Sequence, residues 1–277
     1  MEASGYITLL LVIINVIVSY KGFKDTAFFY RYSFSPDKVL VMKDYKVLVT
    51  DGFLHVGWLH LFFNMFSLFV FSQALEPYMG SIKYLVIYFA SLICGNLFVM
   101  VVNRYVAHHT VVGASGAVSG LIFAAIALFP GLDISLFILP SVPAWLFGLI
   151  FVAYSIWGIR SGKDNIAHEA HLAGALAGLI IACIMFPDAV IQNYVTVLLI
   201  LVPSVAFILF MMRNPTAMLV GKPFARRQQS NQATIDHRYN MDKKKKQEEI
   251  DRILEKIHKR GMGSLTQKEK DILNGKQ

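Results

Sequence analysis

The sequence Val112-Gly113-Ala114-Ser115-Gly116-Ala117-Val118-Ser119-Gly120 opens an apolar run that continues to Phe129. It places the hydroxyl of Ser115 between two glycines. Small residues also let membrane helices pack closely, so Ser115 taken alone is explained as a packing residue. Two other segments favour a functional role, because each puts histidine or amide groups into an apolar stretch, where polar groups are costly. They are His55-Val-Gly-Trp-Leu-His60-Leu-Phe-Phe-Asn64 and Ala170-His171-Leu-Ala-Gly174-Ala-Leu-Ala-Gly178.

The composition is that of a membrane protein. The 277 residues are 56% hydrophobic and 16% charged, with a mean hydropathy of +0.53, which is too apolar for a soluble domain and typical of a polytopic membrane protein. Up to Met212 there are ten Lys and Arg against ten Asp and Glu, so the residues from Arg213 onward supply the whole net charge of +8. A basic tail beside a membrane predicts attraction to the anionic headgroups of the bilayer. Nucleic acid is not an expected partner, because the tail has no interleaved aromatics and no recognisable module.

Apolar segments separated by polar turns predict an all-α bundle of membrane helices. Residues 1–20 have no Lys or Arg before the apolar stretch and no cleavage site after it, so we expect a retained helix and not a signal peptide. Cys94 and Cys183 fall inside apolar runs and are expected as buried, unpaired thiols. Residues 21–53 are rich in aromatics and charge, which is typical of a loop lying partly in the headgroup layer. The seven predicted spans are residues 6–20, 54–74, 84–102, 114–129, 144–159, 166–186 and 190–212.

The chain divides into four predicted parts. Residues 1–189 form a six-helix core, 190–212 an additional membrane helix, 213–246 a basic linker and 247–277 a small helical hairpin. The hairpin is predicted from an apolar face and from a capping box, Thr266-Gln-Lys-Glu269, that opens its second helix. A docking or regulatory element and a solvated remnant are both compatible with this pattern. The apolar face consists of Ile250, Ile253, Leu254 and Ile257.

The membrane histidines suggest acyl-transfer chemistry. Gly116 and Gly120 on the fourth span match Gly174 and Gly178 on the sixth, so we expect these helices to pack and to bring Ser115 toward His171. Ser115 would then be the nucleophile and His171 the general base and acid. His60 and Asn64 are four residues apart on one helix face, where they either bond neighbouring helices or donate to an oxyanion. Glu169 lies on a different helix face from His171, so a dyad is expected instead of a triad.

Taken together, the three motifs resemble the rhomboid family of intramembrane serine proteases. The resemblance covers about residues 50–178 in matching order and spacing, and includes Phe53-Leu54-His55, Trp58-Leu59-His60-Leu61, Asn64-Met65 and Glu76. It implies a rhomboid-like six-helix bundle, here with a seventh helix, and a Ser115–His171 dyad. By the same resemblance the oxyanion is held by His60, Asn64 and the Ser115 amide, and the substrates are transmembrane helices cleaved near the membrane surface. The supporting residues are His55, Gly113, Gly116 and Gly174.

Two features depart from a simple match. The family has Trp-Arg four and three residues before the threonine that corresponds to Thr50, whereas this chain has Lys46 and Val47. The positive-inside rule places the 21–53 loop and the tail in the cytoplasm. The family pattern instead places the first loop and the mouth of the site outside, and we follow the family. The expected location is the inner membrane of a bacterial cell.

Three alternatives compete with a protease. A non-catalytic relative would bind client transmembrane helices without cleaving them, but both Ser115 and His171 are present. A channel or transporter would need charged groups along several spans. A zinc enzyme is not predicted, because His168-Glu169-Ala170-His171 is one residue too short for the HExxH motif, and His108-His109 lies in a polar turn. We therefore expect neither a metal nor another cofactor.

Overall fold

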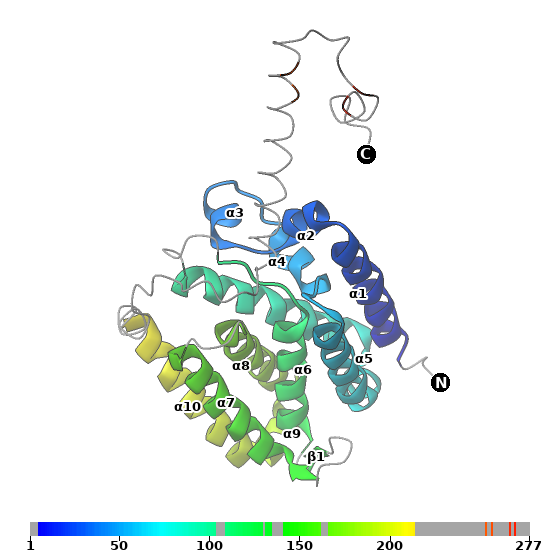
Figure 1. Ribbon diagram of the computed structural model, residues 1–277. Helices are drawn as coiled ribbons and strands as arrows, with labels where there is room; N and C mark the ends of the chain where they lie inside the picture. Colours follow the sequence, from blue (N-terminus) through cyan, green and yellow to red (C-terminus); the bar gives the residue numbers. More distant parts are fainter. Residues whose placement is uncertain are drawn as a thin grey trace. The chain divides into compact units, whose positions relative to one another are not determined.

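The structure is a computed structural model. It describes residues 5–103, 109–129, 131–134, 141–161 and 166–213, together with residues 253, 256, 266 and 269. The chain forms two compact units, Met1–Pro223 and Phe224–Gln277. The first unit is the helical bundle of Figure 1. Its elements are α1 (Tyr6–Lys24), α2 (Thr26–Tyr32), α3 (Pro36–Leu40), α4 (Val47–Thr50), η1 (Asp51–Phe53), α5 (Trp58–Val102), α6 (Ser115–Leu128), β1 (Asp133–Ile134), β2 (Val142–Pro143), α7 (Ala144–Ser161), α8 (His168–Met185), α9 (Pro187–Gln192) and α10 (Tyr194–Arg213).

The predicted all-helical membrane protein is confirmed. Five helices in the described residues are long and apolar enough to cross a bilayer: α1, α5, α7, α8 and α10. The 45-residue α5 contains a kink at Gly80, where φ is 76°, so it supplies two of the predicted spans. The apolar α6 is shorter, with 14 residues. All seven predicted spans therefore correspond to helix.

The first helix is held at its start by a distant carboxylate. An α-helix leaves its first amides without partners inside the helix. Here the Glu76 carboxylate accepts hydrogen bonds from the amides of Ile7 (3.0 Å) and Thr8 (3.1 Å), and from Thr8 Oγ1 (2.6 Å). Figure 1 shows α1 running beside α5, which carries Glu76. The buried Glu76 thus joins two spans.

The predicted loop 21–53 is more helical than expected. α1 continues to Lys24, and α2, α3, α4 and η1 occupy most of the remainder. Asp25 caps α2 by accepting from the Phe28 amide at 2.9 Å, the kind of side-chain cap that stabilises a short helix. Val47, one of the two positions at which the sequence departs from the family pattern, is fully buried. The predicted position in the headgroup layer stays a prediction.

Two boundaries differ from the predicted ones. The second span begins at Trp58, not at residue 54, and it continues through Pro77 to the kink at Gly80. Proline removes one backbone hydrogen bond, whereas the left-handed conformation of Gly80 changes the direction of the chain. The predicted span 190–212 is split into α9 and α10 by a turn at Asn193. The proposed division at residue 189 between core and additional helix stays a prediction.

The central helix of the bundle is α6. Every residue from Gly116 to Leu128 is buried, which explains why this helix is apolar on all sides. It packs most extensively against α8 and α5, and α7 and α10 lie along the flank of the bundle (Figure 1).

The two cysteines lie away from this central helix. Both are free, Cys94 is exposed and Cys183 is half-buried. The expectation of buried thiols was wrong for Cys94, because a membrane helix at the periphery of the bundle also carries apolar residues on the side that faces lipid.

In the second unit, the described residues contain the predicted capping box. Thr266 and Glu269 bond reciprocally, with the Glu269 amide donating to Thr266 Oγ1 (3.3 Å) and the Thr266 amide to Glu269 Oε2 (2.7 Å). Lys256 donates to the same carboxylate at 2.8 Å. These contacts lower the pKa of Glu269 to about 2, Lys256 contributing most. The rest of the predicted linker and hairpin lies outside the described residues.

Candidate active site

Ser115 and His171 lie in direct contact. Ser115 is the first residue of α6, and its Oγ lies 2.6 Å from Nε2 of His171 in the first turn of α8. At this distance the serine hydroxyl can donate to an unprotonated Nε2, which is the geometry that base-assisted nucleophilic attack requires. The Phe151 ring of α7 lies 6.5 Å from the His171 ring, so a third helix flanks the pair.

The two helices meet because glycines face each other. A Cβ placed on Gly174 would collide with the carbonyl oxygen of Gly116, and a Cβ on Gly178 would collide with that of Gly120. Side chains here would push α6 and α8 apart and separate Ser115 from His171. The small-residue pairing that the sequence predicts is therefore present.

Gly113 makes room for His60 beside Ser115. It has φ of +125°, a left-handed conformation that favours glycine. A Cβ at Gly113 would lie 2.8 Å from His60 Cε1, 3.0 Å from His60 Nε2 and 3.7 Å from Ser115 Oγ. The Nε2 edge of His60 and the hydroxyl of Ser115 thus border the same small space.

The Asn64 side chain forms a hydrogen bond within its own helix. Its buried amide donates to the backbone carbonyl of His60, one turn earlier in α5, at 2.9 Å. This bond uses one of the two N–H groups of the side chain, so one remains to donate elsewhere. In this structure Asn64 fixes the helical turn that carries His60.

His55 is buried behind His60. The two rings are in edge-to-face contact, with centroids 4.9 Å apart. His55 Nδ1 lies 2.9 Å from the hydroxyl of Ser19 on α1. Burial lowers the pKa of His55 to about 3, and the neighbouring His60 adds to that shift, so His55 is neutral at physiological pH.

Asp51 supports the site and was not singled out from the sequence. Its backbone carbonyl accepts from the Gly113 amide at 3.0 Å, so η1 holds the segment that leads into Ser115. Asn96 Nδ2 lies 2.9 Å from each carboxyl oxygen of Asp51, which is fully buried. Burial raises the pKa of Asp51 well above its usual value. The sequence did contain a signal for this pair: Asp51 is an acidic residue just before one predicted span, and Asn96 is an amide inside another.

Glu169 belongs to a separate polar group near the start of α8. It accepts from Asn103 Nδ2 at 2.7 Å, and its carboxylate lies 3.7 Å from His109 Nε2. The predicted separation of Glu169 from the dyad is consistent with these contacts. His109, which the sequence places in a polar turn, is partly exposed and lies against this carboxylate. His108 lies outside the described residues.

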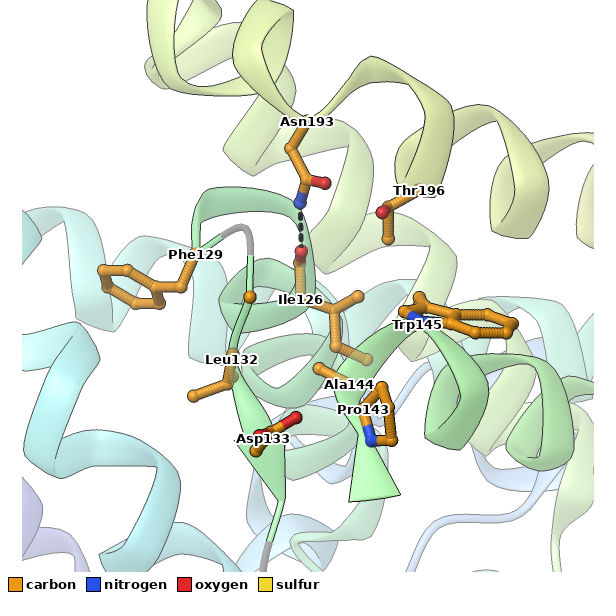
Figure 2. Close-up of a pocket in the computed structure, with 10 residues that line it drawn as sticks. Ile126, Phe129, Leu132, Asp133, Pro143, Ala144, Trp145, Asn193 and Thr196 are labelled. Atoms are coloured by element: carbon orange, nitrogen blue, oxygen red, sulfur yellow. Dashed lines mark hydrogen bonds between the residues drawn. The ribbon is translucent and has the colours of Figure 1, made fainter. Parts of the chain in front are cut away.

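A cavity of about 110 Å³ lies at the opposite end of α6. Figure 2 shows Asn193 above it, donating to the Ile126 carbonyl at 2.7 Å. Trp145 and Pro143 border the other side. The lining residues include no serine, cysteine or histidine, so this cavity lacks a nucleophile–base pair of the kind that Ser115 and His171 form. Within the described part of the chain, no three His, Cys, Asp or Glu residues gather as metal ligands.

Comparison with known proteins identifies a family for this chain. Residues 43–188, just over half of the chain, match the rhomboid domain. The chain belongs to the rhomboid family. The rhomboid domain includes all the site residues described above except Ser19. A separate match covers residues 233–275 and is to a family of unknown function.

The rhomboid relatives are distant. A mitochondrial rhomboid protein 1 of Saccharomyces cerevisiae is 31% identical over 152 residues, which is 51% of this chain and 43% of the yeast protein. A putative rhomboid protease, YdcA, of Bacillus subtilis is 43% identical over 74 residues, 27% of this chain and 36% of that protein. An inactive rhomboid protein 1 of Drosophila melanogaster is 28% identical over 138 residues, 50% of this chain and 9% of the fly protein. The chain thus spans less than half the length of each of these relatives.

Proposed function

We propose that this protein is an intramembrane serine endopeptidase that hydrolyses peptide bonds in or near transmembrane helices. The observation that carries the proposal is the 2.6 Å contact between Ser115 Oγ and His171 Nε2 beside the imidazole of His60. The putative rhomboid protease of Bacillus subtilis supports a proteolytic role. The proposed location is the inner membrane of a bacterial cell. No cofactor is required for this chemistry.

The reaction follows from the positions of these groups. Ser115 Oγ attacks the carbonyl carbon of the substrate, and its proton passes to Nε2 of His171. Negative charge then develops on the carbonyl oxygen, where His60 Nε2, the Ser115 amide and the remaining N–H of Asn64 are the proposed donors. His171 returns the proton to the leaving amine. Water then hydrolyses the acyl-serine by the same exchange of protons.

The proposed substrate is a membrane helix because the surface next to the site is apolar. Trp58, Leu59, Phe62 and Phe63 flank His60 on α5 and are 60%, 69%, 52% and 55% exposed in the protein alone. Such a surface is suited to lipid or to another apolar helix. Backbone amides inside a helix are already bonded, so a segment that unwinds near the surface is the expected point of cleavage.

The decisive experiment uses the full chain in proteoliposomes with a panel of transmembrane peptides. We expect cleavage, with the cut site read by mass spectrometry, and its complete loss in Ser115→Ala. Ser119→Ala, one turn further along α6, is the matched control and should retain activity.

The competing function is a scaffold that binds client helices without cleaving them, and the inactive relative in Drosophila gives this alternative a precedent. If Ser115→Ala still processed the peptides, or if the wild-type chain bound them without any turnover, the protease proposal would be wrong. A fluorophosphonate that labels the wild-type chain but not Ser115→Ala would show independently that Ser115 is nucleophilic.

A further inference from the structure

Three exposed cations converge on one pair of touching rings at the end of the first span. The rings of Phe28 and Tyr32, one turn apart on α2, have centroids 4.6 Å apart. Lys21 Nζ, from the last turn of α1, lies 4.4 Å from the centroid of the Phe28 ring. Arg31 Cζ and Lys46 Nζ lie 5.6 Å and 6.0 Å from the centroid of the Tyr32 ring. The electron-rich faces of the rings attract cations at these distances and so hold three positive charges together.

A fourth cation lies beside these three. Lys24 follows Lys21 by three residues on α1, a spacing that places both on one helix face. Lys24 Nζ lies 5.4 Å from the centroid of the Tyr20 ring, and that ring lies 6.3 Å from the ring of Trp58, the first residue of α5. All four cations are exposed. The name cationic patch is used below for Lys21, Lys24, Arg31 and Lys46 with the rings of Phe28 and Tyr32.

The cationic patch carries more positive charge than the surrounding chain neutralises. Residues 21–46 contain six Lys and Arg against three Asp and no Glu. The Asp25 carboxylate caps α2, and the Asp44 carboxylate lies 3.6 Å from Lys46 Nζ. In the part of the chain that the structure describes, no other ion pair involves the cationic patch. Like charges held close together repel, so an anion from outside the protein would stabilise this arrangement.

The length of the first span places the cationic patch at the membrane surface. The 19 residues of α1, from Tyr6 to Lys24, extend about 28 Å at 1.5 Å per residue. The hydrocarbon core of a bilayer is about 30 Å thick. Lys21 and Lys24 therefore lie at the level of the lipid phosphates when α1 crosses the membrane. The anion that is present at high concentration at this level is the lipid headgroup.

We propose that the cationic patch is a binding site for an anionic phospholipid, with the lipid phosphodiester lying between Lys21 and Arg31. The Arg31 guanidinium presents paired donors that match a phosphate, and the lysines add point charges. A zwitterionic lipid carries a cation beside the same phosphate, and the excess positive charge of the cationic patch repels that cation. The site therefore selects lipids of net negative charge. It is independent of the protease proposal, because the cationic patch contains neither Ser115 nor His171.

The first test measures lipid binding to the full chain in detergent by native mass spectrometry. The probes are phosphatidylglycerol and phosphatidylcholine with identical acyl chains, and we expect phosphatidylglycerol to bind more tightly. Lys21→Gln and Arg31→Gln should each weaken phosphatidylglycerol binding about fivefold, the contribution of one cation near a charged membrane surface. An unchanged unfolding temperature without lipid shows that each variant retains its fold.

Lys83→Gln is the matched control. Lys83 is also an exposed lysine, and its Nζ lies 4.5 Å from the centroid of the Phe186 ring. In the described residues no second cation lies over that ring. This substitution should leave the affinity for phosphatidylglycerol unchanged. An equal loss in Lys83→Gln, or equal affinity of the wild-type chain for both lipids, would refute the site, since any general attraction of the basic tail is common to all these proteins.

The second test locates the lipid. Trp58 lies next to Tyr20, so a phosphatidylglycerol brominated near its glycerol should quench Trp58 fluorescence more than the matching phosphatidylcholine does. The measurement uses the chain with Trp145→Phe and Trp157→Phe, in which Trp58 is the remaining tryptophan. The difference between the lipids should disappear in Lys21→Gln and persist in Lys83→Gln. Equal quenching by both lipids would overturn the proposal.

A third measurement separates a lipid from a free anion. Replacing chloride by inorganic phosphate at constant ionic strength should not displace phosphatidylglycerol, because the acyl chains also hold the lipid at the protein surface. Displacement would show that the cationic patch binds a soluble phosphate, and the assignment to a lipid would be wrong.

Discussion

The two ends of α6 are built alike and differ in one respect. Gly113, with φ of 125°, lies just before the start of α6, and Gly131, with φ of 82°, lies just after its end. Each end is also held from outside the helix, by the Asp51 carbonyl at one end and by the Asn193 side chain at the other. A Cβ on Gly113 would meet His60, whereas a Cβ on Gly131 would meet nothing within 4 Å. A left-handed glycine therefore marks a turn at both ends, and only at Gly113 does the missing side chain also make room for a functional group.

The largest expected effect comes from substituting these two glycines in turn. Gly113→Ala should lower kcat about 100-fold, because the new methyl group would displace His60 from its position as oxyanion donor. Gly131→Ala should leave kcat within twofold and cost about 1 kcal/mol of stability from the strained backbone alone. Both are measured as peptide cleavage and thermal unfolding in the same lipid. Equal losses of activity would mean that backbone strain, and not the contact with His60, explains the glycine at position 113.

A smaller effect is expected where α6 meets α8. Gly174→Ala puts a methyl group against the Gly116 carbonyl, and the resulting overpacking should cost about 1–3 kcal/mol of unfolding free energy. The shift of α8 should also lengthen the contact between Ser115 and His171 and reduce labelling of Ser115 by a fluorophosphonate. Gly57→Ala serves as control, because a Cβ there has nothing within 4 Å and the φ of −179° is extended. Unchanged labelling in Gly174→Ala would show that the bundle absorbs the methyl group elsewhere.

At the far end of α6, the loss of a cap should affect stability without affecting catalysis. Asn193→Ala removes the bond to the Ile126 carbonyl and leaves that buried group unsatisfied, which should cost about 1–3 kcal/mol. Thermal unfolding should detect the change while kcat stays within twofold. A large fall in kcat would mean that the cavity in Figure 2 is coupled to the dyad, which the comparison of the two ends does not predict.

The smallest expected effect is on the pH dependence of stability, through Asp51 near the Ser115 end of α6. The folded-state pKa of Asp51 is raised, so above about pH 4 the unfolded chain releases a proton that the folded chain retains. This contribution to stability is complete below pH 4 and declines as the pH rises toward the folded-state pKa. Asp51→Asn removes the titration and should flatten the fall of the unfolding temperature between pH 5 and 8. An identical slope in both proteins would show that Asp51 is already ionised in the folded chain.

Much of the fold could be predicted from local sequence. The apolar runs predicted where the long helices lie and in which order, because a segment in lipid must satisfy its own backbone by forming a helix. Glycines at matching intervals on α6 and α8 predicted which helices approach most closely. The resemblance to the rhomboid family, now confirmed, covered the region that contains Ser115 and His171.

The remaining features depend on contacts between distant parts of the chain. The turn at Asn193 was missed because its amide bonds to the carbonyl of Ile126, 67 residues earlier. Asp51 was missed because its burial results from the approach of Asn96, 45 residues later. The orientation of the Asn64 amide toward its own helix also could not be inferred from a four-residue spacing, which places a side chain on a face but does not fix its torsion angles.

The bond from Glu76 to the start of α1 has a consequence for biosynthesis. The amide of Thr8 leaves the ribosome 68 residues before the carboxylate that satisfies it. Until the end of the second span, which carries Glu76, has been translated, the opening of the first helix must rely on headgroups or water to bind its free amides. Synthesis of that segment therefore fixes the start of the earliest helix, which also carries Ser19 opposite His55.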